Sequence, residues 1–597
     1  MRRRAKKQTI FELYRGSLIE LNVGTPVKAP VSAALNSLAR CGCVSKDFSR
    51  LASEPTFWMK LCTQRWLHWK NRPPPEYFGW KDIYSTRHRT DRNVLDLLQN
   101  LLEQSSGHLR LMAEISTFEL DCIDILTLIV KSNLWDHSLK FYAKRCLQLV
   151  RKRYILAQWD ALKQGTIDFP IWKGFAMLAM FRSPSIELED IDIKFNALAS
   201  EFIQQISPNN ETLSDEDKCK ALVDFFCRQK GFRGNVERYY NPSNSLIDRI
   251  FETRKGIPIS LAIIFHELCM RVNINGVSLF PTPHHYLLHF TSPTTDTDFF
   301  IDLFNNGKIM SRTEVSQMLS MSFGHLFNDF DLRPPYPLEV YARVLHNIIN
   351  GFRRTQTDHE VLYSALFQLL VIHPHEPVEI YSLWLELLKH MWPEDAVVAA
   401  SLNFVGFHRP ELLRNDLQEI REEYDKGSDR VMRRKRHNVG EGEEDIGDGK
   451  GGPKFEIGMV FFHKRFQYTG VIYGYDEECV AEEDWILRMH VDDLERGRYQ
   501  PFYNCLCDDG SPRYVAEENI QPMFEPKPIP PEIWEDIDRK RFDLDCDRDV
   551  WREQNEGFLE GNQPMNFDAI GRFFVNWSKE FERYLPNKRL RREYPDY

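Results

Sequence analysis

The sequence predicts a multidomain α+β chain with three kinds of folded region. Apolar residues recur at three- and four-residue steps over residues 31–69 and again over residues 80–206, as in helices that pack on a core. A Gly-Ile-Pro sequence then opens an apolar helix that is followed by strand-like runs. Over residues 454–526 apolar residues instead recur at every second position, as in strands, and glycines occur at intervals. This pattern predicts a small, strongly curved β-barrel.

Composition limits the class of protein. A length of 597 residues suits about three to four domains, and the 13% aromatic content supports large cores. The net charge of −10 disfavours general binding to nucleic acid or anionic membranes, and no apolar run approaches a membrane span. The 12 cysteines are scattered, which indicates reduced thiols in the cytoplasm or nucleus. The C-x-C pairs at Cys41 and Cys505 lack a second pair at metal spacing, so we expect no metal and no cofactor.

The N-terminal helical region, residues 31–69, carries the string LARCGCVSKDFSRLASEPTFWMKLCTQRW. Its order of a valine, an aromatic, a leucine and a tryptophan before a closing leucine resembles the second half of an F-box, a helical module that docks on a Skp adaptor. The first half, which opens with Leu-Pro and an acidic residue in that family, is not recognisable in residues 10–30. The resemblance implies an adaptor surface made by Leu38, Val44, Phe48, Leu51, Trp58 and Leu61.

The central region, residues 207–330, places a histidine and an aspartate on consecutive strand-like runs after the apolar helix. Val277–Phe280, Tyr286–Phe290 and Phe299–Phe304 are the runs, and they carry His285 and Asp302. A helix followed by such strands is the layout of papain-like and transglutaminase-like folds, in which a cysteine thiolate at the helix N-terminus is the nucleophile, the histidine its base and the aspartate the group that orients the histidine. The motifs YYN, RKGIPISL, HYLL and IDLFNNGK resemble the transglutaminase-like SirB family over roughly residues 190–330.

The nucleophile of that layout is missing. Ser260 stands near the helix start, and Cys269 lies about two and a half turns further along the helix. We therefore interpret His285 and Asp302 as a degenerate pair whose hydrogen bond locks the strands. A ligand-binding role for the pair and a nucleophilic role for Ser260 are the alternatives.

Two regions follow. Residues 335–425 predict about five helices with prolines near several starts, which resemble tetratricopeptide-like hairpins of the kind that form scaffolds or peptide-binding grooves. Residues 426–453 are charged and glycine-rich, which predicts a disordered linker. The basic run at residues 433–436 is either a nuclear localisation signal or simply solvated.

The C-terminal strand candidates are residues 457–464, 468–476, 486–491, 500–508 and 513–520. Their sequences resemble the YccV-like, or hemimethylated-DNA-binding, family. Residues 455–525 hold six Lys or Arg and fifteen Asp or Glu, and this acidic balance disfavours duplex DNA. A protein-binding surface fits better, and its anchors would be His463, Trp485, Gln500, Pro501, Phe502 and Tyr503; alternatively, the aromatic ones are core residues. Residues 527–597 predict a charged tail with a helix near residues 567–584.

This order of regions resembles the F-box only protein 21 family. The resemblance implies a substrate-recognition subunit of a Skp–cullin–F-box ubiquitin ligase, with a Skp adaptor, a cullin and a protein substrate as partners and with no catalytic residue of its own. Two alternatives stay open. One is a transglutaminase-like hydrolase or transferase that uses His285 and Asp302, and the other is a DNA- or chromatin-binding protein that uses the barrel.

Overall fold

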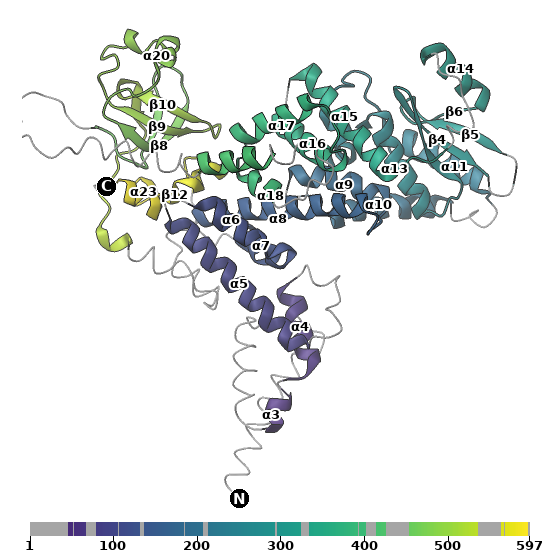
Figure 1. Ribbon diagram of the computed structural model, residues 1–597, viewed down its shortest axis with the longest axis horizontal. Coiled ribbons are helices and arrows are strands. Elements are labelled where there is room, and N and C mark those ends of the chain that lie inside the picture. Colours follow the sequence, from purple (N-terminus) through teal and green to yellow (C-terminus); the bar gives the residue numbers. More distant parts are fainter. Residues whose placement is uncertain are drawn as a thin grey trace, which may run out of the picture. The chain divides into compact units, whose positions relative to one another are not determined.

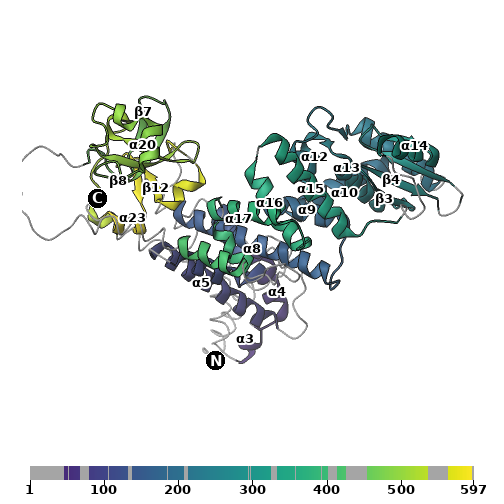
Figure 2. The ribbon, with the colours of Figure 1, turned by 45° about the horizontal axis from the view of Figure 1, so that its top comes forward.

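The chain forms two compact units, Met1–Leu147 with Asp425–Tyr597 and Gln148–Tyr424, and the division falls inside helix α8 (His137–Lys163) (Figures 1 and 2). No helix within the described residues is long and apolar enough to cross a membrane. The computed structural model describes residues 46–51, 53–66, 79–104, 107–131, 137–183, 186–206, 213–292, 295, 297–323, 333–356, 358–391, 393–400, 413–424, 453–534, 563–565 and 567–594.

The N-terminal part of the first unit is helical, as predicted. Its elements are α3 (Lys46–Leu51), α4 (Pro55–Arg65), α5 (Trp80–Glu103), α6 (His108–Ser116), η2 (Glu119–Cys122), α7 (Ile123–Lys131) and the start of α8. The long helix α5 buries Val94, Leu98 and Leu101, whose four- and three-residue spacing lines one face. Helix α4 packs on α5, with the rings of Trp58 and Tyr84 5.4 Å apart in an edge-to-face arrangement.

The C-terminal part of this unit contains a five-stranded antiparallel sheet of order β10-β9-β8-β7-β11. Its strands are β7 (Val460–His463), β8 (Thr469–Asp476), β9 (Phe502–Cys507), β10 (Pro512–Ala516) and β11 (Ile520–Pro522). The edge strands β10 and β11 are consecutive in the chain, so Ala516 and Ile520 are at most about 14 Å apart. The edges of a flat five-stranded sheet would be about 19 Å apart, so the sheet must curl strongly. The predicted closed barrel is not confirmed, since no ladder joins β10 to β11 among the described strands.

Side chains alternate between the two faces of this curled sheet, as the period of two predicted. Phe461, Ile472 and Tyr503 lie in one buried cluster, whereas Val471 and Leu506 lie in another. One predicted strand is wrong. Residues 486–491 lie instead in helix α20 (Glu483–Met489), at His490, and at the start of the turn η8 (Val491–Asp493). Ile486 and Val491 reach the same core cluster, which two side chains five residues apart in one strand could not do, because they would point to opposite faces.

The C-terminal segment folds onto this sheet rather than forming a charged tail. It contains η11 (Asp568–Arg572), β12 (Phe574–Ser578), β13 (Arg583–Pro586) and α23 (Lys588–Glu593), so the helix predicted near residues 567–584 is wrong. Phe574, Tyr584 and Leu590 share one core cluster with Val471 and Leu506 of the sheet. Figure 1 shows β12 and α23, in yellow, beside the green strand β8. The segment thus supplies the apolar cover for one face of the sheet.

The second unit combines helices with a four-stranded antiparallel meander, β3-β4-β5-β6, and a parallel pair of β1 (Arg233–Gly234) with β2 (Lys255–Gly256). The meander strands are β3 (Val277–Thr282), β4 (His285–Thr291), β5 (Asp298–Asp302) and β6 (Lys308–Met310), which confirms the three predicted runs. The buried helix α13 (Pro258–Arg271) packs on β3 and β4. The other helices before α15 are α9 (Ile171–Arg182), α10 (Leu188–Ile206), α11 (Asp215–Asp224), α12 (Ile247–Thr253) and α14 (Arg312–Phe323).

Three long helices come after α14, and α15 packs on α16 as α16 does on α17. They are α15 (Pro337–Thr355), α16 (His359–Ile372) and α17 (Val378–Met391), and the short α18 (Ala396–Ala400) comes next. All residues of α16 from Val361 to Ile372 are buried, so it is the central helix of this layer. The mostly helical chain with separate sheets agrees with the multidomain α+β prediction.

Candidate functional site

Helix α13 presents no cysteine at its N-terminus. Pro258 occupies the first turn, where its missing N–H leaves no bond unmade. The Ser260 side chain is fully buried, and its hydroxyl has no hydrogen-bond partner in the described part of the chain. Cys269 lies deeper in the same helix, where burial and the adjacent Cys219 raise the pKa of its thiol far above the ordinary value. Neither side chain is therefore prepared as a nucleophile.

His285 and Asp302 meet across the meander as predicted. Nε2 of His285 lies 3.0 Å from Oδ2 of Asp302, although the two groups are not in hydrogen-bond geometry. Asn305 donates to both carboxylate oxygens of Asp302, from its backbone N–H at 3.2 Å and from its side-chain amide at 2.6 Å. Burial alone would raise the pKa of Asp302, but hydrogen bonds and the charge of His285 together hold it below the ordinary value. Asp302 is thus an ionised group that lies beside the imidazole.

Arg343 of α15 fixes the turn between β3 and β4, and sequence reasoning did not single it out. Its guanidinium donates to the carbonyl oxygens of Thr282 and His285, at 2.6 and 2.7 Å. It also lies 5.1 Å from the ring centre of Tyr286, and its burial lowers its pKa. A single arginine in an amphipathic helix gives no signal in the sequence, because only the fold brings α15 to this turn.

Two buried asparagines fix the loop before α13. The Asn235 amide donates to Oδ1 of Asn244 at 2.8 Å, and the Asn244 amide donates to the carbonyls of Arg238 and Tyr239. The N–H of Ile257 donates to the Asn244 carbonyl at 3.3 Å, immediately before the helix begins. Neither asparagine was singled out from the sequence alone.

The chemistry available at this site is that of a base and its orienting carboxylate without a nucleophile. The Ser260 hydroxyl makes no hydrogen bond to His285. Cys227 is another buried thiol of this unit, and burial raises its pKa to about 12, so it is not a thiolate at neutral pH either. His285 could accept a proton or bind a polar ligand, but nothing among the described residues of this unit pairs it with a group that attacks. The two side chains meet at 3.0 Å across β4 and β5, which fits a pair that holds these strands together by charge rather than by the predicted hydrogen bond.

Five of the six predicted anchors of the C-terminal sheet lie in its interior. Tyr503, Gln500, Phe502, Pro501 and His463 are buried, and only Trp485, which packs at 5.8 Å from the ring of Tyr514, is partly exposed. The alternative interpretation, a core role, accounts for the buried aromatic residues. A surface role stays a prediction for Trp485.

His463 has a local role in the turn after β7. Its Nδ1 accepts hydrogen bonds from the N–H groups of Arg465 and Phe466, at 3.2 and 3.1 Å. Burial lowers the pKa of His463 to about 4, so the ring is neutral at pH 7 and Nδ1 can accept. The side chain therefore caps a tight turn and does not face a partner.

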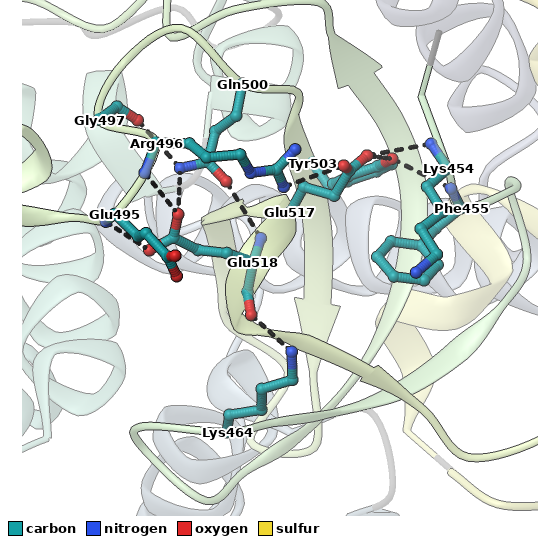
Figure 3. Close-up of polar contacts among 10 residues, drawn as sticks. All are labelled: Lys454, Phe455, Lys464, Glu495, Arg496, Gly497, Gln500, Tyr503, Glu517 and Glu518. Atoms are coloured by element: carbon teal, nitrogen blue, oxygen red, sulfur yellow. Dashed lines mark hydrogen bonds and ion pairs between the residues drawn. The ribbon is translucent and has the colours of Figure 1, made fainter. Parts of the chain in front are cut away.

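Glu518 organises the loop between α20 and β9 (Figure 3). Its carboxylate accepts hydrogen bonds from the backbone N–H groups of Glu495 and Arg496, both at 3.1 Å, and from the Gln500 amide at 2.8 Å. Its own N–H donates to Oε1 of Gln500, and its carbonyl accepts from Nζ of Lys464. Successive N–H groups of this kind form an anion-binding nest, and here the chain's own carboxylate fills it.

Glu517 joins the start of the domain to the same loop (Figure 3). Its carboxylate accepts from the Lys454 N–H at 3.0 Å, the Tyr503 hydroxyl at 2.8 Å and the Arg496 guanidinium at 3.0 Å. Burial alone would raise the pKa of Glu517, but these bonds and the charge of Arg496 lower it. Sequence reasoning counted Glu517 and Glu518 only as negative charge.

Four of the six Lys and Arg residues at 455–525 already bind acidic side chains or a backbone carbonyl of the same domain, which disfavours DNA binding. Arg496 contacts Glu517, Arg498 contacts Glu483 and Asp492, Arg513 contacts Asp509, and Lys464 donates to a backbone carbonyl. A basic patch of the kind that neutralises phosphates would need these groups to leave their partners. The arrangement therefore adds a structural obstacle to the acidic balance of the sequence.

The predicted adaptor residues are only partly within the described chain. Leu38 and Val44 lie outside it, and Phe48 and Leu51 lie in or at the end of α3, where their side chains are not described. Trp58 and Leu61 are buried between α4 and α5, so both hold the helix pair together. The outward face of α4 carries instead Thr56, Met59 and Thr63, of which Met59 is 39% exposed.

Comparisons with known proteins agree with the two domains. The family model of the transglutaminase-like superfamily matches residues 189–346, and that of the hemimethylated DNA-binding protein YccV like matches residues 453–543. Proteins named F-box only protein 21 from Homo sapiens and Pongo abelii are 25% and 24% identical, over 82% of this chain and 85% of each relative. A UPF0162 protein of Xylella fastidiosa (strain Temecula1 / ATCC 700964) is 29% identical over 38% of this chain and 80% of its own length. No solved structure matches.

The predicted transglutaminase-like and YccV-like resemblances are thereby confirmed, in the predicted order, whereas the F-box-like and tetratricopeptide-like resemblances stay predictions. The C-terminal cover, residues 563–594, lies beyond the part that the YccV-like model matches. The chain combines a transglutaminase-like domain with a YccV-like domain and is similar, along most of its length, to F-box only protein 21.

Proposed function

We propose that the chain is a substrate-recognition subunit of a Skp–cullin–F-box ubiquitin ligase. One observation carries the proposal: the similarity to proteins named F-box only protein 21 extends over 82% of the chain rather than over one domain. In this function the N-terminal helices bind a Skp adaptor and through it a cullin, while the transglutaminase-like and YccV-like domains bind the protein substrate. The compartment would be the cytoplasm, the nucleus or both.

The chain itself would be non-catalytic. Ubiquitin transfer requires no nucleophile from a recognition subunit, because the chemistry lies in partner subunits. The site supports this, since His285 and Asp302 lack a paired nucleophile and Asp302 is occupied by Asn305. His285 would keep a structural role or contact a bound substrate.

The adaptor surface would include the outward face of α4. Trp58 and Leu61 cannot serve as test positions, because removal of a buried Trp or Leu destabilises the α4–α5 pair by about 2–5 kcal/mol whether or not an adaptor binds. Met59 is exposed on the opposite side of α4, so its replacement leaves the helix packing intact. We expect Met59→Glu to weaken adaptor binding by placing a charge in an apolar contact.

Co-purification of the full chain with a Skp adaptor tests the proposal. Met270→Glu is the matched control, because Met270 is also an exposed helical methionine, 59% exposed, and lies in α13. Retention of the adaptor by the wild type and by Met270→Glu, with loss in Met59→Glu, would support the proposed function. Absence of the adaptor from all three would contradict it.

The two alternatives give different results in the same preparation. A transglutaminase-like enzyme would release or transfer acyl groups from peptide glutamine or ester substrates, and His285→Gln would abolish this turnover. A DNA-binding protein would bind duplex DNA with an affinity that falls steeply with salt. Neither property is expected of a recognition subunit.

A further inference from the structure

The segment between β8 and β9 is a separate lobe on the curled sheet. It spans residues 477–499 and contains α20 and η8, and Figure 1 shows α20 at the end of the sheet away from α23. Ile486 and Val491 anchor it by packing against Phe502 and Ala516. With these residues facing inward, the rest of the lobe is directed away from the sheet.

Four large apolar side chains of this lobe are exposed: Val480 at 45%, Leu487 at 67%, Met489 at 45% and Tyr499 at 77%. Met489 is two residues after Leu487 and so lies on another face of the helix. We call the other three, Val480, Leu487 and Tyr499, the α20 patch. The Cys479 N–H donates to the Arg498 carbonyl at 3.0 Å, so the chain segments that carry Val480 and Tyr499 run next to each other. Leu487 is one helical turn after Glu483, and Glu483 holds the Arg498 guanidinium at 2.8 Å. These contacts tie together the chain segments that carry the three side chains.

The surroundings of the α20 patch are acidic. Residues 477–499 contain eight Asp or Glu and three Lys or Arg, a net charge of −5. Arg498 is bound between Glu483 and Asp492, and Arg496 is bound to Glu517, so neither presents its charge to a partner. Asp484 is exposed three residues before Leu487 and thus lies beside the patch. Arg488 is exposed next to Leu487, but the acidic residues of the lobe outnumber it, so the surface is an apolar centre with a mainly negative rim.

We propose that the α20 patch binds a segment of a protein substrate in which apolar residues are flanked by lysine or arginine. The proposal rests on the proposed function, because it assigns the patch to substrate. Exposed aromatic and aliphatic side chains supply the affinity of such a contact, and the acidic rim attracts basic residues and repels acidic peptides and nucleic acid. The same rim makes the binding weaken with salt.

Fluorescence anisotropy of the full chain without an adaptor tests the proposal. The probe is a short fluorescein-labelled peptide with a central pair of leucines flanked by lysines, and the comparison peptide carries glutamates in place of the lysines. We expect binding of the lysine peptide alone, and a loss of about tenfold or more in Leu487→Ser and in Tyr499→Ser, as for anchor residues of an interface. Met523→Ser is the matched control, because Met523 lies in the same domain, is 47% exposed and is outside the lobe.

A charge pair separates local from general electrostatics. Asp484→Lys and Glu580→Lys change the net charge equally, but only Asp484 borders the patch, whereas Glu580 is an exposed residue of the C-terminal segment. We expect Asp484→Lys to weaken binding and Glu580→Lys to leave it unchanged. Equal effects of the two variants, equal binding of both peptides, or no effect of the serine variants would overturn the proposal.

The chain's own basic run is a competing occupant. In a further variant the four basic residues 433–436 are replaced by uncharged ones. If the lysine peptide binds this variant and does not bind the wild type, the basic run of the chain itself occupies the α20 patch, and the proposal is overturned. The adaptor experiment is independent of all these outcomes, because it uses variants of α4 and no peptide. Failure of the patch and failure of the ligase function are therefore distinguishable.

Discussion

Gly458, just before β7, should be essential for attaching the C-terminal segment to the sheet. Its φ is +86°, and a Cβ at this position would lie 2.1 Å from the carbonyl oxygen of Tyr584, a backbone atom that cannot rotate away. The Tyr584 N–H donates to the Gly458 carbonyl at 2.9 Å, so the two backbones are in direct contact. Gly458→Ala must push β13 away from the sheet.

The cost can be worked from these contacts. An alanine in this left-handed conformation loses about 1–2 kcal/mol. Separation of the two backbones also removes the Tyr584–Gly458 hydrogen bond, which contributes about 0.5–1.5 kcal/mol. The sum, about 1.5–3.5 kcal/mol, corresponds to a roughly 10- to 300-fold increase in local opening, since about 1.4 kcal/mol is tenfold.

Hydrogen exchange followed by mass spectrometry measures this opening in peptides that cover residues 574–586. Gly510→Ala is the matched control: its φ is +78°, but an added Cβ would meet only a side-chain atom of Phe567 at 3.9 Å. We expect faster exchange of residues 574–586 in Gly458→Ala and unchanged exchange there in Gly510→Ala. Equal protection in wild type and Gly458→Ala would refute the docking of this segment on the sheet.

Three further predictions concern pH and buried polar groups. The pKa of His463 falls from an ordinary 6.5 to about 4 on folding, so the unfolded chain takes up a proton first and the folded state loses stability as the pH falls from about 6.5 to about 4. The difference between the denaturant midpoints at pH 7 and pH 5 should therefore be smaller in His463→Asn, which keeps a hydrogen-bond acceptor, than in the wild type or in the exposed control His490→Asn. The pKa of Asp302 is lowered in the folded chain, so its contribution is present at neutral pH and lost in acid, and the stability difference between wild type and Asp302→Asn should shrink as the pH falls below about 4. Asn244→Ala should destabilise the second unit by about 1–3 kcal/mol in denaturant unfolding, because Asn235 and two carbonyls lose their partner; Asn241→Ala, which removes one bond to the Ser243 N–H, should cost less.

The sequence predicted elements whose pattern is local. The period of two in β7 to β10 and the apolar helix α13 follow from side chains that face one core, and the order of α13, His285 and Asp302 located the pair. Adjacent antiparallel strands bring residues near in sequence together, so this pairing could be expected from the order of the strand-like runs alone.

The errors came from residues whose partners are distant in sequence. Phe574 and Tyr584 are among charged residues and looked like part of a tail, but their partners Val471 and Leu506 lie about a hundred residues earlier. His463 and Gln500 are a different case: each makes a hydrogen bond with backbone two or three residues away, but only the fold of the surrounding strands and loops buries these side chains. Arg343 again has distant partners, since it acts on a turn far from it in the chain.

Reconstituted ubiquitin transfer tests the central claim most directly. The full chain is assembled with a Skp adaptor, a cullin complex and the charging enzymes, and transfer onto a protein captured by the chain is measured for the wild type, Met59→Glu, Met270→Glu and His285→Gln. The account predicts transfer with the wild type, Met270→Glu and His285→Gln, and loss of transfer with Met59→Glu. Transfer that needs His285 but is indifferent to Met59, or no transfer with the wild type, would contradict it.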